Sequence, residues 1–299
     1  MINFESYAEN MDKDNFYAKS EKIISQDAIS LNDFKDHYGE DVIKEDERYV
    51  DQMERKFKQE DTPEKREVLK LATIFEALIH KHIKESDWLG SNASSIKTSR
   101  YDDIKNGIDN IVEFKETKTS ASYLGLAIDV SLSSEIGGKF ERIKKEIDEE
   151  NLPQIKYFYS EHMNIRGSLE KIPRVVIGAS PKTVKELAEL SFTDNYKAME
   201  VHPIQFEIME EIIVQLRRFR DYAESLGKKD IALTYENGIN LVENIRKNKE
   251  KEIKNPKQYD YMMDVIEENL LRFPIPKKQM ISDEKKDAAK KRFQILNKK

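Results

Sequence analysis

Apolar residues recur at two different spacings along this chain, and the spacings predict helices and strands. The clearest helix start lies at Asp61–Glu64, where Thr62 can cap the helix and Pro63 suits its first position. Apolar side chains three and four residues apart then predict a helix to about Glu85. Its buried stripe consists of Leu69, Ala72, Phe75, Ile79 and Ile83.

β-Branched and aromatic runs in the middle of the chain predict strands. They lie at residues 101–104, 108–114, 123–132, 154–159 and 174–178. Asn106-Gly107 predicts a hairpin between the first two runs, because this dipeptide readily adopts positive φ. The run at 123–132 is the most apolar, which is typical of a central strand covered on both faces.

Apolar residues at helical spacing also occur between the later strands, and they predominate from about residue 200 onward. Predicted helices lie at residues 137–147, from 181 onward behind a Ser180 cap, and at 204–225, 230–249 and 259–271. Loose apolar spacing near the N-terminus predicts short helical patches rather than one long helix. The chain therefore divides into an acidic, mostly helical or irregular region at 1–65, a mixed core at 66–195, a helical region at 196–276 and a basic tail at 277–299.

Composition narrows the class of protein. The 299 residues are 36% charged and include no cysteine, so disulfides and thiolate metal sites are excluded. The first residues lack the basic and apolar regions of a signal peptide, and no run approaches 18 apolar residues. We therefore expect a cytoplasmic protein without a membrane partner.

Charge is unevenly distributed around the net value of −6. Acidic residues outnumber basic ones in 1–66, and basic residues outnumber acidic ones in 277–299. Two interpretations stay open: both ends are solvated and flexible, or the tail contacts phosphates while the acidic end shields a basic groove. The same choice applies to the basic helical cluster Arg217, Arg218 and Arg220, where a solvated helix face is the simpler interpretation.

Three carboxylates interrupt apolar segments. Glu76 lies on or beside the stripe of the first helix, Asp109 begins one strand, and Asp129 lies late in the most apolar strand. A buried carboxylate is costly unless it is paired or binds a metal. These residues are therefore the candidates for chemistry.

The order helix, three strands, helix, strand, with acids at these positions, resembles the PD-(D/E)XK nuclease superfamily over residues 66–180. The resemblance implies a mixed α/β fold with an α-β-β-β-α-β core, a mixed central sheet and a helical C-terminal region. Asp109 would be the first acid of the motif and Asp129 the second. Ser131 stands where the motif has lysine, and Lys139 on the following helix is the candidate replacement.

The resemblance implies a metal-dependent nuclease that cleaves nucleic acid, with DNA favoured over RNA. Asp109, Asp129 and Glu76 would hold Mg²⁺ or Mn²⁺, and Lys139 would complete the catalytic set. The chemistry suits such residues, because Mg²⁺ prefers hard oxygen ligands and activates water for phosphodiester cleavage. Ser131 keeps a rival open, namely an inactive nuclease-like scaffold that binds nucleic acid or a protein. A helical interaction protein without the predicted strands is a third interpretation.

Other polar residues have competing structural explanations. Glu76 can pair with Lys97, Arg100 or a strand-end amide, and Asp102 and Asp103 suit the chemistry of a turn. Glu113 is either a third ligand or a solubilising surface charge. His80 and His82 are two residues apart, which does not direct both at one metal, so we expect them on the helix surface.

Overall fold

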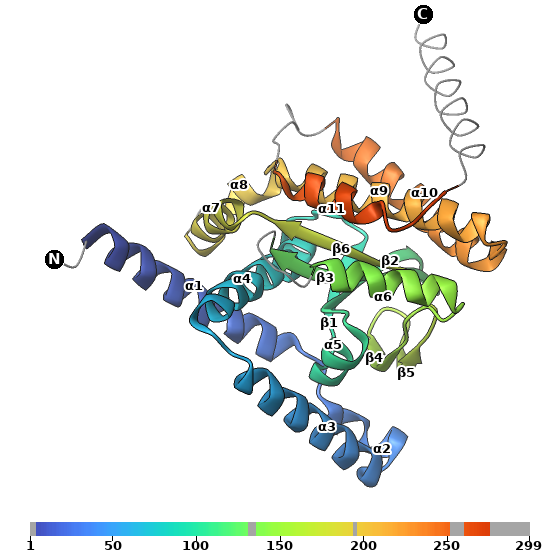
Figure 1. Cartoon of the computed structure of the whole chain (residues 1–299), viewed down its shortest axis with the longest axis horizontal. Coiled ribbons are helices and arrows are strands. Elements are labelled where there is room, and N and C mark those ends of the chain that lie inside the picture. The colour runs from blue at the N-terminus through green and yellow to red at the C-terminus, as the bar shows by residue number, and fades with distance from the viewer. Residues whose placement is uncertain (1–3, 131–135, 194–195, 252–259, 276–299) are drawn as a thin grey trace, which may run out of the picture.

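The computed structural model describes residues 4–130, 136–193, 196–251 and 260–275. At its centre lies a four-stranded sheet in the order β1 (Ala93–Lys97), β2 (Asn110–Thr117), β3 (Ser120–Val130) and β6 (Arg174–Ala179) (Figure 1). The first three strands are antiparallel neighbours, and β3 and β6 are parallel. The predicted mixed α/β fold with a mixed sheet is therefore confirmed, and the interpretation without strands is wrong.

Helices and one hairpin surround this sheet. The N-terminal elements are α1 (Phe4–Asp27), the 3₁₀ helix η1 (Leu31–Phe34), α2 (Lys35–Tyr38) and α3 (Glu40–Gln59). The middle of the chain adds α4 (Pro63–Glu85), α5 (Arg100–Asn106), α6 (Ile136–Asp148), the hairpin β4 (Ile155–Ser160) and β5 (Ile165–Leu169), and α7 (Pro181–Phe192). The C-terminal helices are α8 (Tyr196–Glu200), α9 (Ile204–Ser225), α10 (Lys229–Lys249) and α11 (Met262–Leu270).

The predicted helix at 63–85 forms as α4. The side chain of Thr62 accepts the backbone N–H of Lys65 at 3.3 Å, so the expected cap is present. Phe75, Ile79 and Ile83 are buried against the sheet side of the molecule, but Leu69 is 61% exposed. The stripe therefore begins later along the helix than the sequence pattern predicts.

The prediction for residues 93–107 is wrong. The first strand is β1, and the residues expected as a strand at 101–104 belong to helix α5. Ser99 starts this helix by accepting the N–H of Asp102 at 3.1 Å. Gly107, with φ of +64°, ends it as a left-handed C-terminal cap, so the Asn-Gly signal marks a helix end and not a hairpin.

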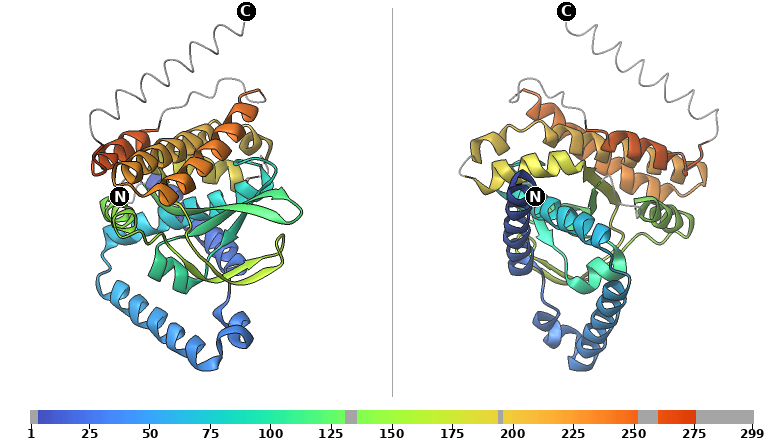
Figure 2. Two further views of the ribbon diagram at one scale, coloured as in Figure 1. Left: turned by 90° about the vertical axis from the view of Figure 1, so that its right-hand side faces the viewer. Right: turned by 60° about the vertical axis from the view of Figure 1, so that its left-hand side comes forward.

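Two long helices, α1 and α3, replace the short patches expected near the N-terminus. Figures 1 and 2 show α2 and α3 at one end of the molecule and α9, α10 and α11 at the opposite end, with the sheet between them. We call residues 31–59, which comprise η1, α2 and α3, the arm. None of the helices within the described ranges is long and apolar enough to cross a bilayer.

Apolar packing covers the sheet in two separate clusters. The larger cluster joins the sheet to the helices and includes Phe75, Leu126, Phe140 and Phe219. A smaller cluster lies between the sheet and the β4–β5 hairpin and consists of Ile108, Ile111, Ile155, Phe158 and Ile172. The hairpin, whose second strand the sequence pattern missed, is thus part of the core.

A side chain from α9 covers the outer edge of β6. Gln215 accepts the N–H of Val176 at 2.9 Å and donates to its carbonyl oxygen at 2.6 Å. One amide side chain therefore supplies both hydrogen bonds that a neighbouring strand would make. Glu211, one turn earlier, accepts the N–H of Gly178 at 3.1 Å.

Candidate functional site

Asp109 lies where β2 begins, at the point beyond which β3 is paired only with β6. Its carboxylate accepts the N–H of Ile128 at 2.6 Å, in a place where a longer β2 would offer a carbonyl. Lys139 on α6 donates to the carbonyl oxygen of the same Ile128 at 2.7 Å. The structure therefore brings together Asp109 and Lys139, two of the four predicted catalytic residues, on the edge of β3 that β2 leaves uncovered.

Asp103 joins this group from helix α5. The carboxyl groups of Asp103 and Asp109 share a hydrogen bond, and Arg100 donates to Asp103 at 2.5 Å. The side chain of Asp103 keeps 22% of its surface exposed, so solvent reaches one side of an otherwise buried pair. Asp103 fits the chemistry of a turn in the sequence pattern and was not among the predicted site residues. The signal was the left-handed Gly107, which turns the chain back so that Asp103 faces Asp109.

Glu76 and Lys97 form an ion pair beside the two aspartates. The distance between Lys97 Nζ and Glu76 Oε1 is 2.8 Å, and Lys97 also donates to the backbone carbonyl oxygen of Asp109 at 2.7 Å. The predicted pairing of Glu76 with Lys97 is therefore confirmed. This pair remains close enough for both charges to act on Asp109. We call these residues the carboxylate cluster: Glu76, Lys97, Arg100, Asp103, Asp109 and Lys139.

The two aspartates have opposite electrostatic environments. Burial, followed by the negative charge of Asp103, raises the pKa of Asp109, and Lys139 opposes this only in part. Burial also acts to raise the pKa of Asp103, but Lys97 and Arg100 outweigh it, so this pKa is lowered. A hydrogen bond between two carboxyl groups requires a proton on one of them. The pair therefore holds one proton, or needs a cation in its place.

Asp129 and Ser131 complete the list of predicted motif positions. The backbone of Asp129 pairs in register with Gly178 of β6, while its side chain and the whole of Ser131 lie outside what the structure describes. Within the described ranges, no group of three or more histidines, aspartates or glutamates is arranged to hold a metal ion. The described donor set is therefore two adjacent aspartates, hard oxygen ligands of the kind that Mg²⁺ prefers.

Two further acids turn out to be structural. Asp102 is fully buried and accepts the backbone N–H groups of Lys156 at 2.8 Å and Tyr157 at 3.0 Å, which ties α5 to β4. Glu113 is only 2% exposed and accepts hydrogen bonds from Tyr123 and Ser160. The prediction of Glu113 as a surface charge is therefore wrong, and its hydrogen bonds engage it in the hairpin interface.

The prediction of His80 and His82 as surface residues is also wrong. His80 is buried between Ser95 at 2.9 Å and Asp27 at 2.8 Å. His82 is buried between Ser86 at 2.9 Å and Ser191 at 2.7 Å. Burial lowers the pKa of both rings, that of His82 to about 3, so each is a neutral hydrogen-bonded group of the interior.

The basic cluster of α9 pairs with neighbouring elements. Arg217 binds Glu243 at 2.7 Å and Arg220 binds Glu236 at 2.6 Å, both on α10. Arg218 approaches the carbonyl oxygen of Phe273 at 3.5 Å. These contacts join α9 to neighbouring segments, so they give no support to a role of the cluster in phosphate binding. The basic tail at 277–299, the other predicted phosphate contact, lies outside the described residues.

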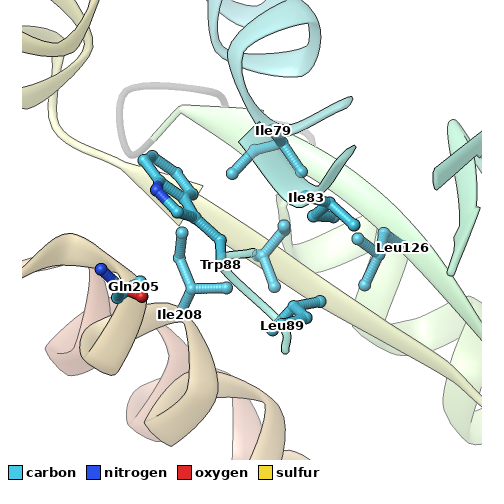
Figure 3. A pocket seen from close by; sticks show the side chains of 8 residues that line it. Ile79, Ile83, Trp88, Leu89, Leu126, Gln205 and Ile208 are labelled. Carbon is cyan, nitrogen blue, oxygen red and sulfur yellow. The ribbon is translucent and has the colours of Figure 1, made fainter. Parts of the chain in front are cut away.

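A pocket lies between the sheet and the helices α4 and α9, and no residue of the carboxylate cluster lines it. Figure 3 shows its lining, which includes Ile79, Ile83, Trp88, Leu126 and Ile208. The lining is almost wholly apolar and leaves no room for a water molecule. The pocket is therefore a packing gap and not a binding site.

Comparisons with protein-family models, with curated proteins and with solved structures found no match to this chain.

Proposed function

We propose that this protein is a metal-dependent nuclease with a core of the PD-(D/E)XK type. With α5 and the β4–β5 hairpin left out, the order α4, β1, β2, β3, α6, β6 supports the proposal, since it follows the α-β-β-β-α-β order that the resemblance implies, with β1 in place of the strand expected at 101–104. The strand directions are compatible with such a core, and α5 and the β4–β5 hairpin are then insertions into it.

The observation that carries the proposal is the pair of hydrogen-bonded carboxyl groups of Asp103 and Asp109, flanked by Lys97 and Lys139. Two acids in contact are stable only if a proton or a cation neutralises one charge. Asp103 and Asp109 would hold Mg²⁺ or Mn²⁺, and Asp129 stays a predicted third ligand. When bound, the ion would activate water and offset negative charge on the phosphate.

Two basic residues of the cluster, Lys139 and Lys97, would take the place of the missing motif lysine. Lys139 reaches the edge of β3 from α6, and Lys97 reaches the same place from β1. Both place positive charge beside Asp109, where a scissile phosphate would need compensation. Lys139 is the proposed catalytic lysine, because Lys97 is only 4% exposed and already neutralises Glu76. Glu76 would act by holding Lys97 in position.

An inactive nucleic-acid-binding scaffold is the second candidate. One observation favours it: Glu76 is engaged by Lys97 and Asp109 by the backbone of β3, so both acids have structural partners. The two candidates differ in cleavage, not in binding.

The test is cleavage of labelled single- and double-stranded DNA and RNA, with DNA expected as the better substrate. We expect products with Mg²⁺ or Mn²⁺ and none with EDTA. Asp109→Asn and Asp129→Ala should each lower the rate at least a hundredfold, because each removes a negatively charged ligand. Glu267→Gln, an exposed change on α11, is the matched control and should cleave like the parent. Absence of metal-dependent products, or equal cleavage by Asp109→Asn, would reject the proposed activity.

A further inference from the structure

Arg100 connects the carboxylate cluster to the arm. One of its nitrogens donates to Asp103 at 2.5 Å, while its Nε donates to Glu54 of α3 at 3.0 Å. The side chain of Arg100 is 51% exposed, so solvent reaches it. A carboxylate of the arm therefore occupies an arginine that directly contacts the proposed metal ligand Asp103.

Three ion pairs join the arm to the rest of the molecule, and in each the acid belongs to the arm. Asp36 accepts two hydrogen bonds from Arg166, both at 2.9 Å, and Asp46 contacts Lys156 at 2.5 Å. In these pairs, as in the pair of Glu54 with Arg100, the arm supplies the acid and the core supplies the base. The core therefore supplies the basic partner in each of these three ion pairs.

The two halves of the arm are held differently. Its base is anchored by an apolar cluster in which Leu31, Phe34 and Ile43 pack against Tyr157 of the hairpin. From residue 47 to residue 59 no side chain of α3 is buried. This distal segment rests on the Glu54–Arg100 pair, on the ring contact of Tyr49 with Tyr101, and on Lys105, which lies 5.1 Å from the Tyr49 ring centre. Segments with few buried contacts open at low cost in free energy.

We propose that the distal segment of α3, residues 47–59, covers a phosphate-binding surface formed by Arg100 and Lys105, and that Glu54 is the carboxylate of this cover that binds Arg100. Glu54 takes the place of a backbone phosphate of the nucleic acid. A guanidinium binds carboxylate and phosphate through the same fork of N–H groups, so the two anions compete for Arg100. Exposed ion pairs are weak, which allows the phosphate to displace Glu54. This inference rests on the proposed function for the identity of the ligand.

The binding test compares Glu54→Gln with Asp51→Asn, which removes the same charge from an exposed position of the same helix. Fluorescence anisotropy of labelled DNA and RNA oligonucleotides is measured in EDTA, where a metal-dependent enzyme cannot cleave. We expect Glu54→Gln to bind about three- to fivefold more tightly than Asp51→Asn, the range set by one exposed ion pair. Arg100→Gln should bind more weakly than the parent. Equal affinity of the two acid variants, or absence of binding by all of them, overturns the cover.

A second measurement separates this inference from the proposed function. Hydrogen exchange of the parent should become faster in residues 47–59 when oligonucleotide is added, and stay unchanged in residues 31–46, which the apolar base holds. Unchanged exchange in 47–59 overturns the cover. Tighter binding by Glu54→Gln without metal-dependent cleavage retains the cover and rejects the nuclease. If the parent cleaves but Glu54→Gln binds no more tightly, the nuclease proposal stands and the proposed cover by residues 47–59 is rejected.

Discussion

Asp109 and Lys139 show how one residue pair can have a structural and a chemical role together. β3 extends beyond the start of β2, which would leave the N–H and C=O of Ile128 without partners, a costly state for buried backbone groups. Asp109 accepts from the first group and Lys139 donates to the second. The backbone thus fixes both side chains at the sheet edge, and the Asp103–Asp109 contact builds on that fixed position.

His82 gives a prediction about stability at low pH. Its ring is fully buried and its pKa is lowered to about 3, whereas an unfolded histidine titrates near its usual value of about 6.5. As pH falls below that usual value, His82 binds a proton in the unfolded chain but stays neutral in the folded chain. The folded state therefore loses stability relative to the unfolded state. We expect His82 alone to cost about 3 kcal/mol between pH 7 and pH 4.

The measurement is the free energy of urea unfolding at pH 7, 5 and 4. His82→Gln can keep a hydrogen bond to Ser86 or Ser191 but cannot titrate, so its stability should fall less steeply toward pH 4 than that of the parent. His37→Gln, at an exposed ring of the arm, should retain the steep dependence. Parallel curves for the parent and His82→Gln would contradict the assignment.

At the scale of elements, two side chains of α9, Gln215 and Glu211, hydrogen-bond to the edge of β6, and Gln215 makes two of the three bonds. Gln215 is fully buried and supplies both hydrogen bonds to Val176. Gln215→Leu keeps the approximate volume but leaves a buried N–H and a buried C=O unpaired, each costing about 1–3 kcal/mol. We expect unfolding free energy to fall by about 3 kcal/mol, measured by urea denaturation.

The matched control for this contact is Gln52→Leu on the exposed face of α3, which should change stability by less than about 0.5 kcal/mol. Hydrogen exchange adds a local readout, because the amide of Val176 should lose protection in Gln215→Leu. A variant as stable as the control would show that the hydrogen bonds of Gln215 do not contribute to the stability of the α9–β6 contact.

The elements that the sequence predicts well are those with dense apolar spacing and a clear boundary. α4 has its Thr62 cap, and α9 has long apolar periodicity over Ile204–Ser225. β1 was missed because its sequence, Ala-Ser-Ser-Ile-Lys, is mostly polar, and pairing with β2 rather than propensity makes it a strand. α5 was missed because seven residues give too short a window for periodicity, so its caps decide its form.

The sequence predicts part of the candidate site, namely the residues that lie beside well-predicted elements. Asp109 and Lys139 were found because they lie next to well-predicted elements, β2 and α6. Asp103 was missed because its position depends on helix α5, which the strand interpretation does not contain, and Gly107 was interpreted as part of a hairpin turn and not as the cap of this helix. The competition between Glu54 and a phosphate for Arg100 involves residues 46 apart and could not be inferred from local pattern.

At the scale of the whole molecule, the arm is a unit attached to the core through one apolar anchor. Phe34 is 1% exposed, and its ring packs edge-on against Tyr157 at 5.3 Å between ring centres. Phe34→Ala should lower the free energy that holds the arm on the core by about 3 kcal/mol. The arm has few other buried residues, so this loss is close to the whole of that free energy. Because the sheet and its helices form a separate apolar cluster, the rest of the molecule should stay folded.

Limited proteolysis resolves this outcome. In Phe34→Ala, cleavage sites should appear within residues 31–59 while a fragment beginning near α4 persists, and the thermal transition of that fragment should match the parent. Phe57→Ala, at a ring that is 46% exposed on the distal segment, should resist protease like the parent. Cooperative loss of all structure in Phe34→Ala would mean that the arm and the core fold as one unit, because the anchor would then support the sheet as well as the arm.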